Sequence, residues 1–507
     1  MGSISLELCR LAQYGIDSGL IEEADRHYVL NRLLSTLGLG DFSREEVPAE
    51  QLPTPAPILQ NILDWAAETG RLEPNTIDAR DQLDTELMAC MTPWPSQVNA
   101  RFYELLRTDG PEAATDYYYT LSRKSNYIRV DRIDKDEKWT YSSPYGEMVV
   151  TINLSKPEKD PRAIAAARSA PQSGYPKCAL CRENEGFRGD ASKAARGNHR
   201  LIRLSLGAEE WFLQYSPYVY YNEHCILLNA RHIPMTVSKE SMGKLLEFVA
   251  QFPHYFAGSN ADLPIVGGSI LSHDHFQGGH YELPMAKARV RERVRFPGFE
   301  DVDAGILHWP MSVLRLKSEA ASRLCELADR ILTFWRSYSD PAADILAFTG
   351  ETPHNTITPI SRIRDGKFEL DLVLRNNRTT AEHPLGLFHP HAEYHHIKKE
   401  NIGLIEVMGL AILPARLKTE LKLLEDCLTG GQSEEEVFSR EDMKKHAEWY
   451  ETLKARALPK EEVRAALQAD IGRIFTQILE NAGVYKNDEA GKAAFRRFIA
   501  AFGGEAL

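Results

Sequence analysis

The segment His273-Asp-His-Phe-Gln-Gly-Gly279 places a polar side chain at every second position. On a β-strand, side chains at positions i, i+2 and i+4 point to one face, so His273, His275 and Gln277 are expected to form a polar row. The two glycines would let a phosphate group or another backbone approach closely. Polar groups beside apolar residues such as Ile270 are costly to bury without a partner. The pattern therefore predicts a functional strand, and the alternative is a hydrogen-bonded histidine pair on an exposed strand.

Strand and helix patterns surround this segment in an order that occurs twice. Before it, three strand patterns and one amphipathic helix pattern cover Leu201–Leu206, Trp211–Tyr215, Cys225–Leu228 and Lys239–Phe252. After it, one helix pattern, two strand patterns and a second His-x-His cover Ala320–Arg336, Thr356–Ile363, Phe368–Arg375 and His389–His391. This mixture predicts an α+β fold with two antiparallel-sheet halves and packed helices. The repeated order suggests an internal duplication, although identity between the halves is too low to establish one.

Helical patterns occupy both ends of the chain, from Ser5 to about Ser122 and from Arg416 to Phe502. A chain of 507 residues is long enough for several domains of roughly 100–200 residues each. We therefore predict a helical N-terminal region, a first half with the metal and the nucleophile, a second half and a helical C-terminal region. Their bounds are residues 1–125, 126–310, 311–415 and 416–507.

Composition and charge exclude several classes of protein. The net charge of −12 argues against a nucleic-acid or anionic-membrane binder, because those present a dominant basic surface. Seven cysteines, an odd number with one close pair, argue against a disulfide framework. The first residues lack a signal-peptide pattern, and the most apolar stretch, Ile402–Leu413, is too short to span a bilayer. We expect a soluble, cytoplasmic protein.

The close pair of cysteines, Cys178-Ala-Leu-Cys181, has the spacing of two thiolates on one tetrahedral zinc. A redox pair is the rival interpretation, because one Cys-x-x-Cys is only half of a zinc site. Two further ligands must come from elsewhere, and the candidates are His232 and His273, with His224 in reserve. A redox motif would not need them.

A His-x-His-x-Gln segment that follows a Cys-x-x-Cys pair resembles the galactose-1-phosphate uridylyltransferase family, a branch of the histidine-triad superfamily. The stretches Gln214–Tyr218, Phe252–Phe256 and Gly258–Gly268 resemble the bacterial type-2 form, which is about as long as this chain. The resemblance implies two histidine-triad-like halves. It also implies a role in galactose metabolism, in which UMP passes from UDP-glucose to galactose 1-phosphate and yields glucose 1-phosphate and UDP-galactose.

The resemblance also assigns roles to individual residues of this sequence. It makes His275 the nucleophile that carries UMP and Gln277 a contact to the phosphoryl group. It implies one structural zinc on Cys178, Cys181, His232 and His273. Nucleotide and phosphate contacts fall on Asn184, Gly267, Gly268 and Ser269, and a sugar contact falls on Glu406.

The sequence departs from the type-1 form of the family at several positions. Asp274 and Phe276 fill the gaps of the histidine row, where the type-1 form has proline and glycine. The type-1 form holds a second metal, for which His389 and His391 could supply ligands, but the matching place for its glutamate ligand, near residue 291, offers no convincing candidate. One zinc site is therefore expected. Because type-1 relatives are dimers, a homodimer is expected as well.

Even without the family resemblance, the residue types in this row suit the transfer of a nucleotidyl group. Neutral imidazole is a competent nucleophile near neutral pH, since its unperturbed pKa is about 6.5. A backbone carbonyl that accepts from Nδ1–H of His275 would leave Nε2 able to attack phosphorus. A glutamine at 277 can stabilise phosphoryl oxygens but has no labile proton to deliver. Two alternatives stay open: a related dinucleoside polyphosphate phosphorylase or adenylyl-sulfate transferase, and a zinc-stabilised nucleotide-binding module without turnover.

Overall fold

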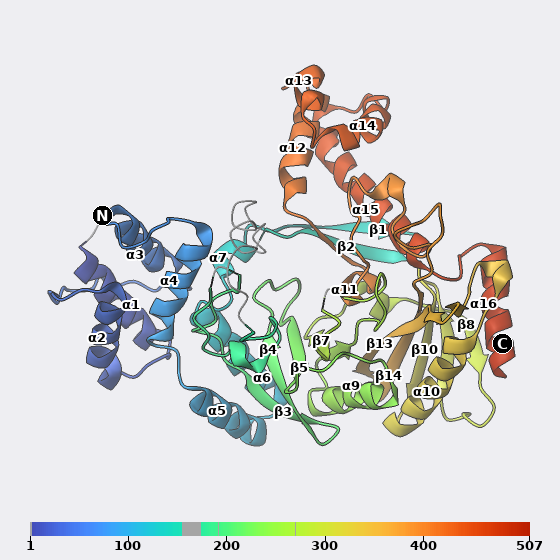
Figure 1. The fold of residues 1–507 in the computed structure, drawn as a ribbon, viewed down its shortest axis with the longest axis horizontal. Coiled ribbons are helices and arrows are strands. Elements are labelled where there is room, and N and C mark those ends of the chain that lie inside the picture. Colours follow the sequence, from blue (N-terminus) through green and yellow to red (C-terminus); the bar gives the residue numbers. More distant parts are fainter. Residues whose placement is uncertain (1–2, 155–173, 191, 269) are drawn as a thin grey trace. The chain divides into compact units, whose positions relative to one another are not determined.

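The computed structural model describes residues 3–154, 174–190, 192–268 and 270–507. The chain forms two compact units that each draw on separate stretches of sequence. The first unit comprises Met1–Lys135 and Pro157–Ile233, and the second comprises Asp136–Lys156 and Pro234–Leu507. Helices and antiparallel strands occur in both, which confirms the predicted α+β class (Figure 1). The four segments predicted from the sequence remain a prediction.

The first unit combines seven helices with three strands in its described part. Its helices are α1 (Ile4–Asp17), α2 (Arg26–Leu37), α3 (Ala56–Glu68), α4 (Ile77–Ala89), α5 (Pro95–Thr108), α6 (Pro111–Lys124) and α7 (Val130–Ile133). Strand β4 (Glu209–Tyr215) pairs antiparallel with β3 (Ile202–Leu206) and with β5 (Cys225–Asn229). A proline opens α5 and another opens α6, where its missing N–H has no helical partner to lose. Tyr215 in β4 donates its hydroxyl to the carbonyl of Thr115 at 3.0 Å and so attaches α6 to the sheet.

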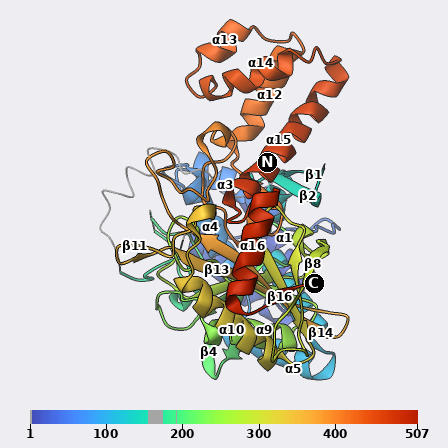
Figure 2. The same ribbon diagram turned by 90° about the vertical axis from the view of Figure 1, so that its right-hand side faces the viewer.

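The second unit is built on an antiparallel sheet whose strands run in the order β16-β8-β9-β10-β14-β13-β6-β7. Their bounds are Glu505–Ala506, Val290–Arg295, Asp303–Leu307, Val313–Ser318, Lys367–Asn376, Asn355–Arg364, Phe256–Gly258 and His275–Gly279. Three helices, α9 (Lys239–Gln251), α10 (Ala321–Ser337) and α16 (Glu489–Phe502), pack their apolar sides against one face (Figures 1 and 2). Alternate residues of the central strands, such as Leu370, Leu372 and Leu374, enter this core. The opposite face carries the polar side chains described below.

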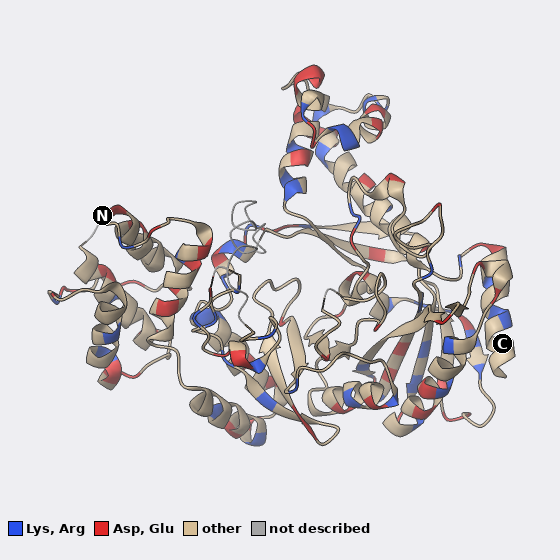
Figure 3. Ribbon diagram, in the orientation of Figure 1, with Lys and Arg blue, Asp and Glu red and all other residues tan. Residues whose placement is uncertain are grey.

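Smaller elements complete the second unit. Strand β2 (Gly146–Ile152) pairs antiparallel with β1 (Glu137–Ser143) and parallel with β15 (Leu410–Leu413). A short helix, α11 (Leu404–Val407), precedes β15. The C-terminal helices are α12 (Arg416–Leu428), α13 (Glu434–Ser439), α14 (Ala447–Lys454) and α15 (Val463–Ala482), which confirms the helical character predicted for this end. Along the helices of both units, acidic and basic side chains are interspersed (Figure 3).

One prediction about the histidine row is wrong in detail. Strand β7 begins at His275, so His273 lies before the strand and the alternation rule covers only His275 and Gln277. The second His-x-His, at His389 and His391, lies in a loop that ends at the short 3₁₀ turn Ala392–Tyr394, and proline at 390 could not donate to a strand ladder. None of the helices in the described part of the chain is long and apolar enough to cross a bilayer.

Candidate active site and metal centre

His275 is held by its own chain at the start of β7. Its side chain is buried, and Nδ1 lies 2.8 Å from the carbonyl oxygen of His273. A carbonyl can only accept, so Nδ1 carries the proton and Nε2 keeps its lone pair. Burial lowers the pKa of His275 to about 4, against the smaller opposing effect of the hydrogen bond to His273. The imidazole is therefore neutral at physiological pH, in the tautomer that an Nε2 nucleophile requires.

Gln277 shares the face of β7 on which His275 lies. Gln277 is half-buried and lies opposite Gly258 of strand β6. Phe276, which separates His275 from Gln277 in the sequence, is buried on the other face of the strand. A Cβ atom at Gly258 would lie 2.8 Å from Cδ1 of Leu404 and 3.0 Å from the carbonyl oxygen of Pro359. Glycine is needed here because helix α11 comes close to the sheet beside Gln277. The predicted phosphoryl contact and the helix that carries Glu406 are thus neighbours.

The glycine turn before β7 is tightly packed. A Cβ atom at Gly267 would lie 2.6 Å from the carbonyl oxygens of Ala261 and Leu263, and one at Gly268 would lie 2.7 Å from Nδ2 of Asn260. Ile265 adopts φ +73°, which a β-branched residue rarely does. Such strain occurs often at functional sites. Ser269, the third residue predicted in this turn, lies outside the described residues.

Glu406 is buried and has partners for both carboxylate oxygens. Oε1 lies 2.6 Å from Nζ of Lys398, and Oε2 accepts from the backbone N–H of Gly403 at 2.8 Å. The second contact caps the N-terminus of α11. Each carboxylate oxygen has two lone pairs, so a sugar hydroxyl would add to these contacts instead of replacing them. Sequence reasoning missed Lys398, since nothing in its local pattern signals a buried lysine.

Three of the predicted metal ligands converge within the first unit. The Sγ atoms of Cys178 and Cys181 are 3.6 Å apart, and Sγ of Cys181 lies 3.2 Å from Nδ1 of His232. Zinc–ligand bond lengths predict about 3.8 Å between two sulfurs and about 3.5 Å between sulfur and nitrogen in a tetrahedral site. These residues form a cluster that could bind a metal ion and that fits zinc. A redox pair has no use for the imidazole. His273, the fourth predicted ligand, is buried in the second unit.

Asn184 braces the cysteine loop. Its Nδ2 donates to the carbonyl oxygen of Cys178 at 2.9 Å and to that of Cys181 at 2.8 Å. Both amide N–H groups are therefore engaged, and a nucleotide contact by Asn184 is restricted to its Oδ1 atom. The reserve ligand His224 packs on the rings of Tyr220 and Tyr221 and does not join the cluster found among the described residues.

The histidines of the second half are held by polar atoms of their own loop. Nε2 of His389 contacts Oδ1 of Asn401 at 3.3 Å, and Nε2 of His391 contacts the carbonyl oxygen of Leu387 at 3.1 Å. The ring of His391 stacks on that of His383 with centroids 4.1 Å apart. In the described part of the chain, these residues do not form a group of three or more converging metal ligands.

A buried neutral imidazole beside a strained glycine turn suits an enzyme that attacks phosphorus, and comparison with known proteins assigns the chain to the nucleotidyltransferases. The sequence-family model for the N-terminal domain of galactose-1-phosphate uridyl transferase matches residues 19–234, and the family model for the C-terminal domain matches residues 247–429. The chain belongs to the galactose-1-phosphate uridylyltransferase family.

Several relatives that are named galactose-1-phosphate uridylyltransferase match nearly the whole chain. The galactose-1-phosphate uridylyltransferase of Halalkalibacterium halodurans is 52% identical over 98% of this chain and 98% of its own length. That of Bacillus subtilis is 50% identical over 99% of this chain and 98% of its own. That of Caldanaerobacter subterraneus is 48% identical over 98% of each.

Proposed function

We propose that this enzyme transfers UMP from UDP-glucose to galactose 1-phosphate through a uridylyl group on His275. The hydrogen bond from Nδ1 of His275 to the carbonyl of His273 is the observation that carries the proposal. Nε2 attacks the α-phosphorus of UDP-glucose, a phosphorus–nitrogen bond forms, and the bond to the glucose 1-phosphate oxygen breaks. The phosphate of galactose 1-phosphate then attacks the same phosphorus, which releases His275 and UDP-galactose.

The leaving group explains the choice of glutamine at position 277. A sugar phosphate has a second pKa of about 6 and departs without a proton donor. The amide of Gln277 supplies a hydrogen bond to the phosphoryl oxygens and no proton. Gly267, Gly268 and Ser269 would hold phosphate, Asn184 the nucleotide and Glu406 the sugar hydroxyls. Family membership favours hexose phosphates over the dinucleoside polyphosphate and adenylyl-sulfate alternatives.

We assign one zinc ion to Cys178, Cys181, His232 and His273. Four protein ligands leave no open position, so the ion would act as a structural support and would supply no bound water. His273 would then be immobilised at its side chain, while its carbonyl orients His275. The expected cytoplasmic location and homodimer remain part of the proposal.

Isotope exchange tests the covalent route directly. The enzyme is expected to exchange labelled glucose 1-phosphate into UDP-glucose in the absence of galactose 1-phosphate, because the first half-reaction is reversible by itself. Label from the α-phosphate of UDP-glucose should be recovered on His275 by peptide mapping. Absence of both exchange and labelled protein would favour direct transfer and remove His275 from its role.

A further inference from the structure

The sheet face that carries Gln277 also carries a buried network of charged residues. Residues paired directly across neighbouring strands point their side chains to the same face. The pairing connects Gln277 to Arg315 across five strands, through Gly258, Ile360 and Asp371. Asp371 in β14 and Arg315 in β10 therefore lie on the face of the predicted active site, three and four strands away from β7, respectively.

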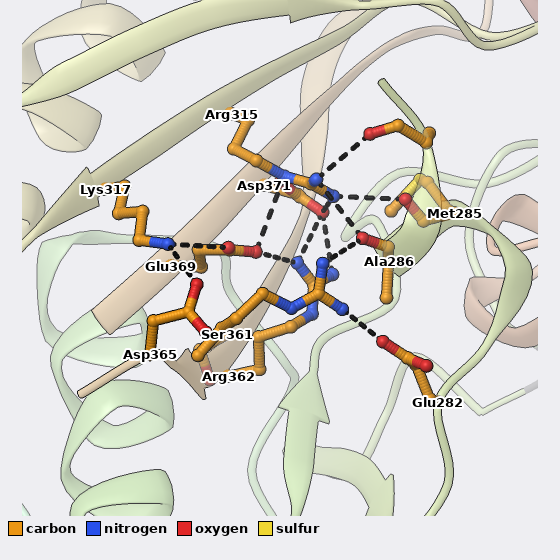
Figure 4. Close-up of polar contacts among 12 residues, drawn as sticks. Glu282, Met285, Ala286, Arg315, Lys317, Ser361, Arg362, Asp365, Glu369 and Asp371 are labelled. Carbon is orange, nitrogen blue, oxygen red and sulfur yellow. Dashed lines mark hydrogen bonds and ion pairs between the residues drawn. The ribbon is translucent and has the colours of Figure 1, made fainter. Parts of the chain in front are cut away.

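Asp371 is the centre of this network (Figure 4). It is fully buried and accepts from Nε and Nη2 of Arg315 at 2.7 and 2.9 Å. It also accepts from Nη1 and Nη2 of Arg362 at 2.9 and 2.7 Å, and Arg362 bonds Glu369 as well. Burial alone would raise the pKa of Asp371, but the two guanidinium groups hold it below its usual range.

Arg315 has a second set of partners that Arg362 lacks. Its Nη2 donates to the carbonyl of Met285 at 3.0 Å, and its Nη1 lies 3.3 Å from the carbonyls of Ala286 and Ala288. These carbonyls belong to the 3₁₀ turn Pro284–Lys287, here called the η3 turn, and to the residue after it. Arg364 donates to the carbonyl of Ala286 from the other side at 2.7 Å. Two arginines thus hold the segment that leaves β7.

The η3 turn also contacts the C-terminal end of α11. The N–H of Met285 donates to the carbonyl of Met408 at 3.0 Å, one residue after the helix. At Gly409, with φ +93°, a Cβ atom would lie 2.9 Å from Cβ of Pro284. The η3 turn therefore connects the strand of His275 and Gln277 with the helix of Glu406.

We propose that Arg315 is a positioning residue for the transfer reaction. Oriented by Asp371, it fixes the η3 turn and through it the distance between Gln277 and Glu406. A buried ion pair is seldom more stabilising than apolar side chains of the same volume, so stability alone does not explain the network. The planar guanidinium, however, has five N–H donors in a fixed arrangement and binds Asp371 and the turn carbonyls together, whereas a lysine has only three donors. The inference rests on the roles proposed above for Gln277 and Glu406.

Two matched substitutions test the inference. Arg315→Lys and Arg362→Lys both keep the charge, both affect a buried arginine bound to Asp371, and only the first removes contacts to the η3 turn. We expect Arg315→Lys to lower kcat/KM for galactose 1-phosphate about tenfold or more, since misplacement by 1 Å costs on the order of 10²-fold. Most of the loss should appear in KM for the hexose phosphate. Arg362→Lys should change this KM much less than Arg315→Lys does, even where the two variants lose the same thermal stability.

Equal kinetic losses in the two variants, in proportion to their loss of stability, would overturn the inference. If Arg315→Lys does not fold, Arg364→Gln provides a second test, because it removes the hydrogen bond to Ala286 from a partly exposed side chain. This variant should raise the KM for galactose 1-phosphate. An unchanged KM would also overturn the inference. Isotope exchange by the unmodified enzyme separates this outcome from failure of the proposed function. If the unmodified enzyme shows isotope exchange but the two lysine variants lose equal activity, only the role of Arg315 is rejected. If the unmodified enzyme shows no exchange, the covalent mechanism itself is rejected.

Discussion

At the scale of single residues, the structure distinguishes His275 from its neighbours on β7. Its ring is buried and orientated by a carbonyl two residues earlier, while Gln277 is only half-buried on the same face. A residue that merely filled space would not need a defined tautomer. This tautomer is the one that the proposed attack by Nε2 requires, and the partial exposure of Gln277 is compatible with its proposed contact to the substrate.

Replacement of the proposed nucleophile, His275, should abolish the reaction. We expect His275→Ala to show no transfer and no isotope exchange, because no other side chain of β7 can attack phosphorus. Zinc content and thermal stability should stay close to those of the unmodified enzyme. Measurable exchange in this variant would show that the uridylyl group is carried elsewhere.

Substitutions at Gln277 test whether this residue favours transfer over hydrolysis, as its proposed role requires. Gln277→Ala should keep the nucleophile and lose one phosphoryl hydrogen bond, which costs on the order of 10²–10³ in rate by analogy with oxyanion-hole deletions. Gln277→His adds an acid/base group that can activate water, so release of UMP from UDP-glucose without an acceptor should rise relative to transfer. Transfer by Gln277→Ala at the unmodified rate would show that Gln277 does not touch the phosphoryl group.

At the scale of elements, the close approach of α11 to β6 depends on one glycine. Gly258→Ala would place Cβ against Leu404 and Pro359, so α11 must move away from Gln277 and transfer should fall about tenfold or more. Gly243→Ala is a matched control within α9, where the new Cβ meets only Sγ of Cys325 at an ordinary 3.8 Å. Alanine there favours the helix by about 1 kcal/mol. Equal activity of the two variants would contradict the importance of this approach.

The cysteine loop is the second element that can be tested by itself. We expect Cys178→Ser to lower zinc content and to reduce the melting temperature by about 3 °C or more, because metal affinity adds to folding stability. Cys90→Ser, at a cysteine outside the cluster, should retain the metal. A metal-free enzyme with full activity and stability would reject the site.

Asn184 allows its two roles to be separated. Asn184→Asp keeps an oxygen for the nucleotide but loses the N–H donors to Cys178 and Cys181. Loss of a group that hydrogen-bonds to metal-binding residues typically changes metal affinity by about 10–100-fold. We expect faster zinc loss to a chelator, and a change in KM for UDP-glucose without any change in zinc retention would contradict this.

At the scale of the whole molecule, the proposed route predicts a kinetic pattern. Glucose 1-phosphate must leave before galactose 1-phosphate enters, so double-reciprocal plots of initial rate should be parallel. The plots report on the complete cycle and do not depend on the role of any single residue. Intersecting lines would indicate that both substrates must be bound together.

Features that depend on local spacing could be predicted from the order of residues alone. The alternation of His275 and Gln277 follows from the period of a strand, and the helical period predicted Lys239–Phe252, observed as α9 at Lys239–Gln251. The two-residue gap of Cys178 and Cys181 likewise allowed two thiols to meet, as they do at 3.6 Å. In each case the interacting groups are close in the chain, so secondary-structure geometry is sufficient to bring them together.

Contacts that join distant segments of the chain could be identified only from the folded structure. Arg315 and Asp371 are separated by 56 residues and meet because β10 and β14 pair in one particular register. Lys398 meets Glu406 in a loop with no periodic pattern, and Gly258 is needed only because α11 packs beside it. The register between strands that are distant in sequence depends on which apolar faces become buried together in the folded chain, so one local stretch of sequence is not sufficient to predict it.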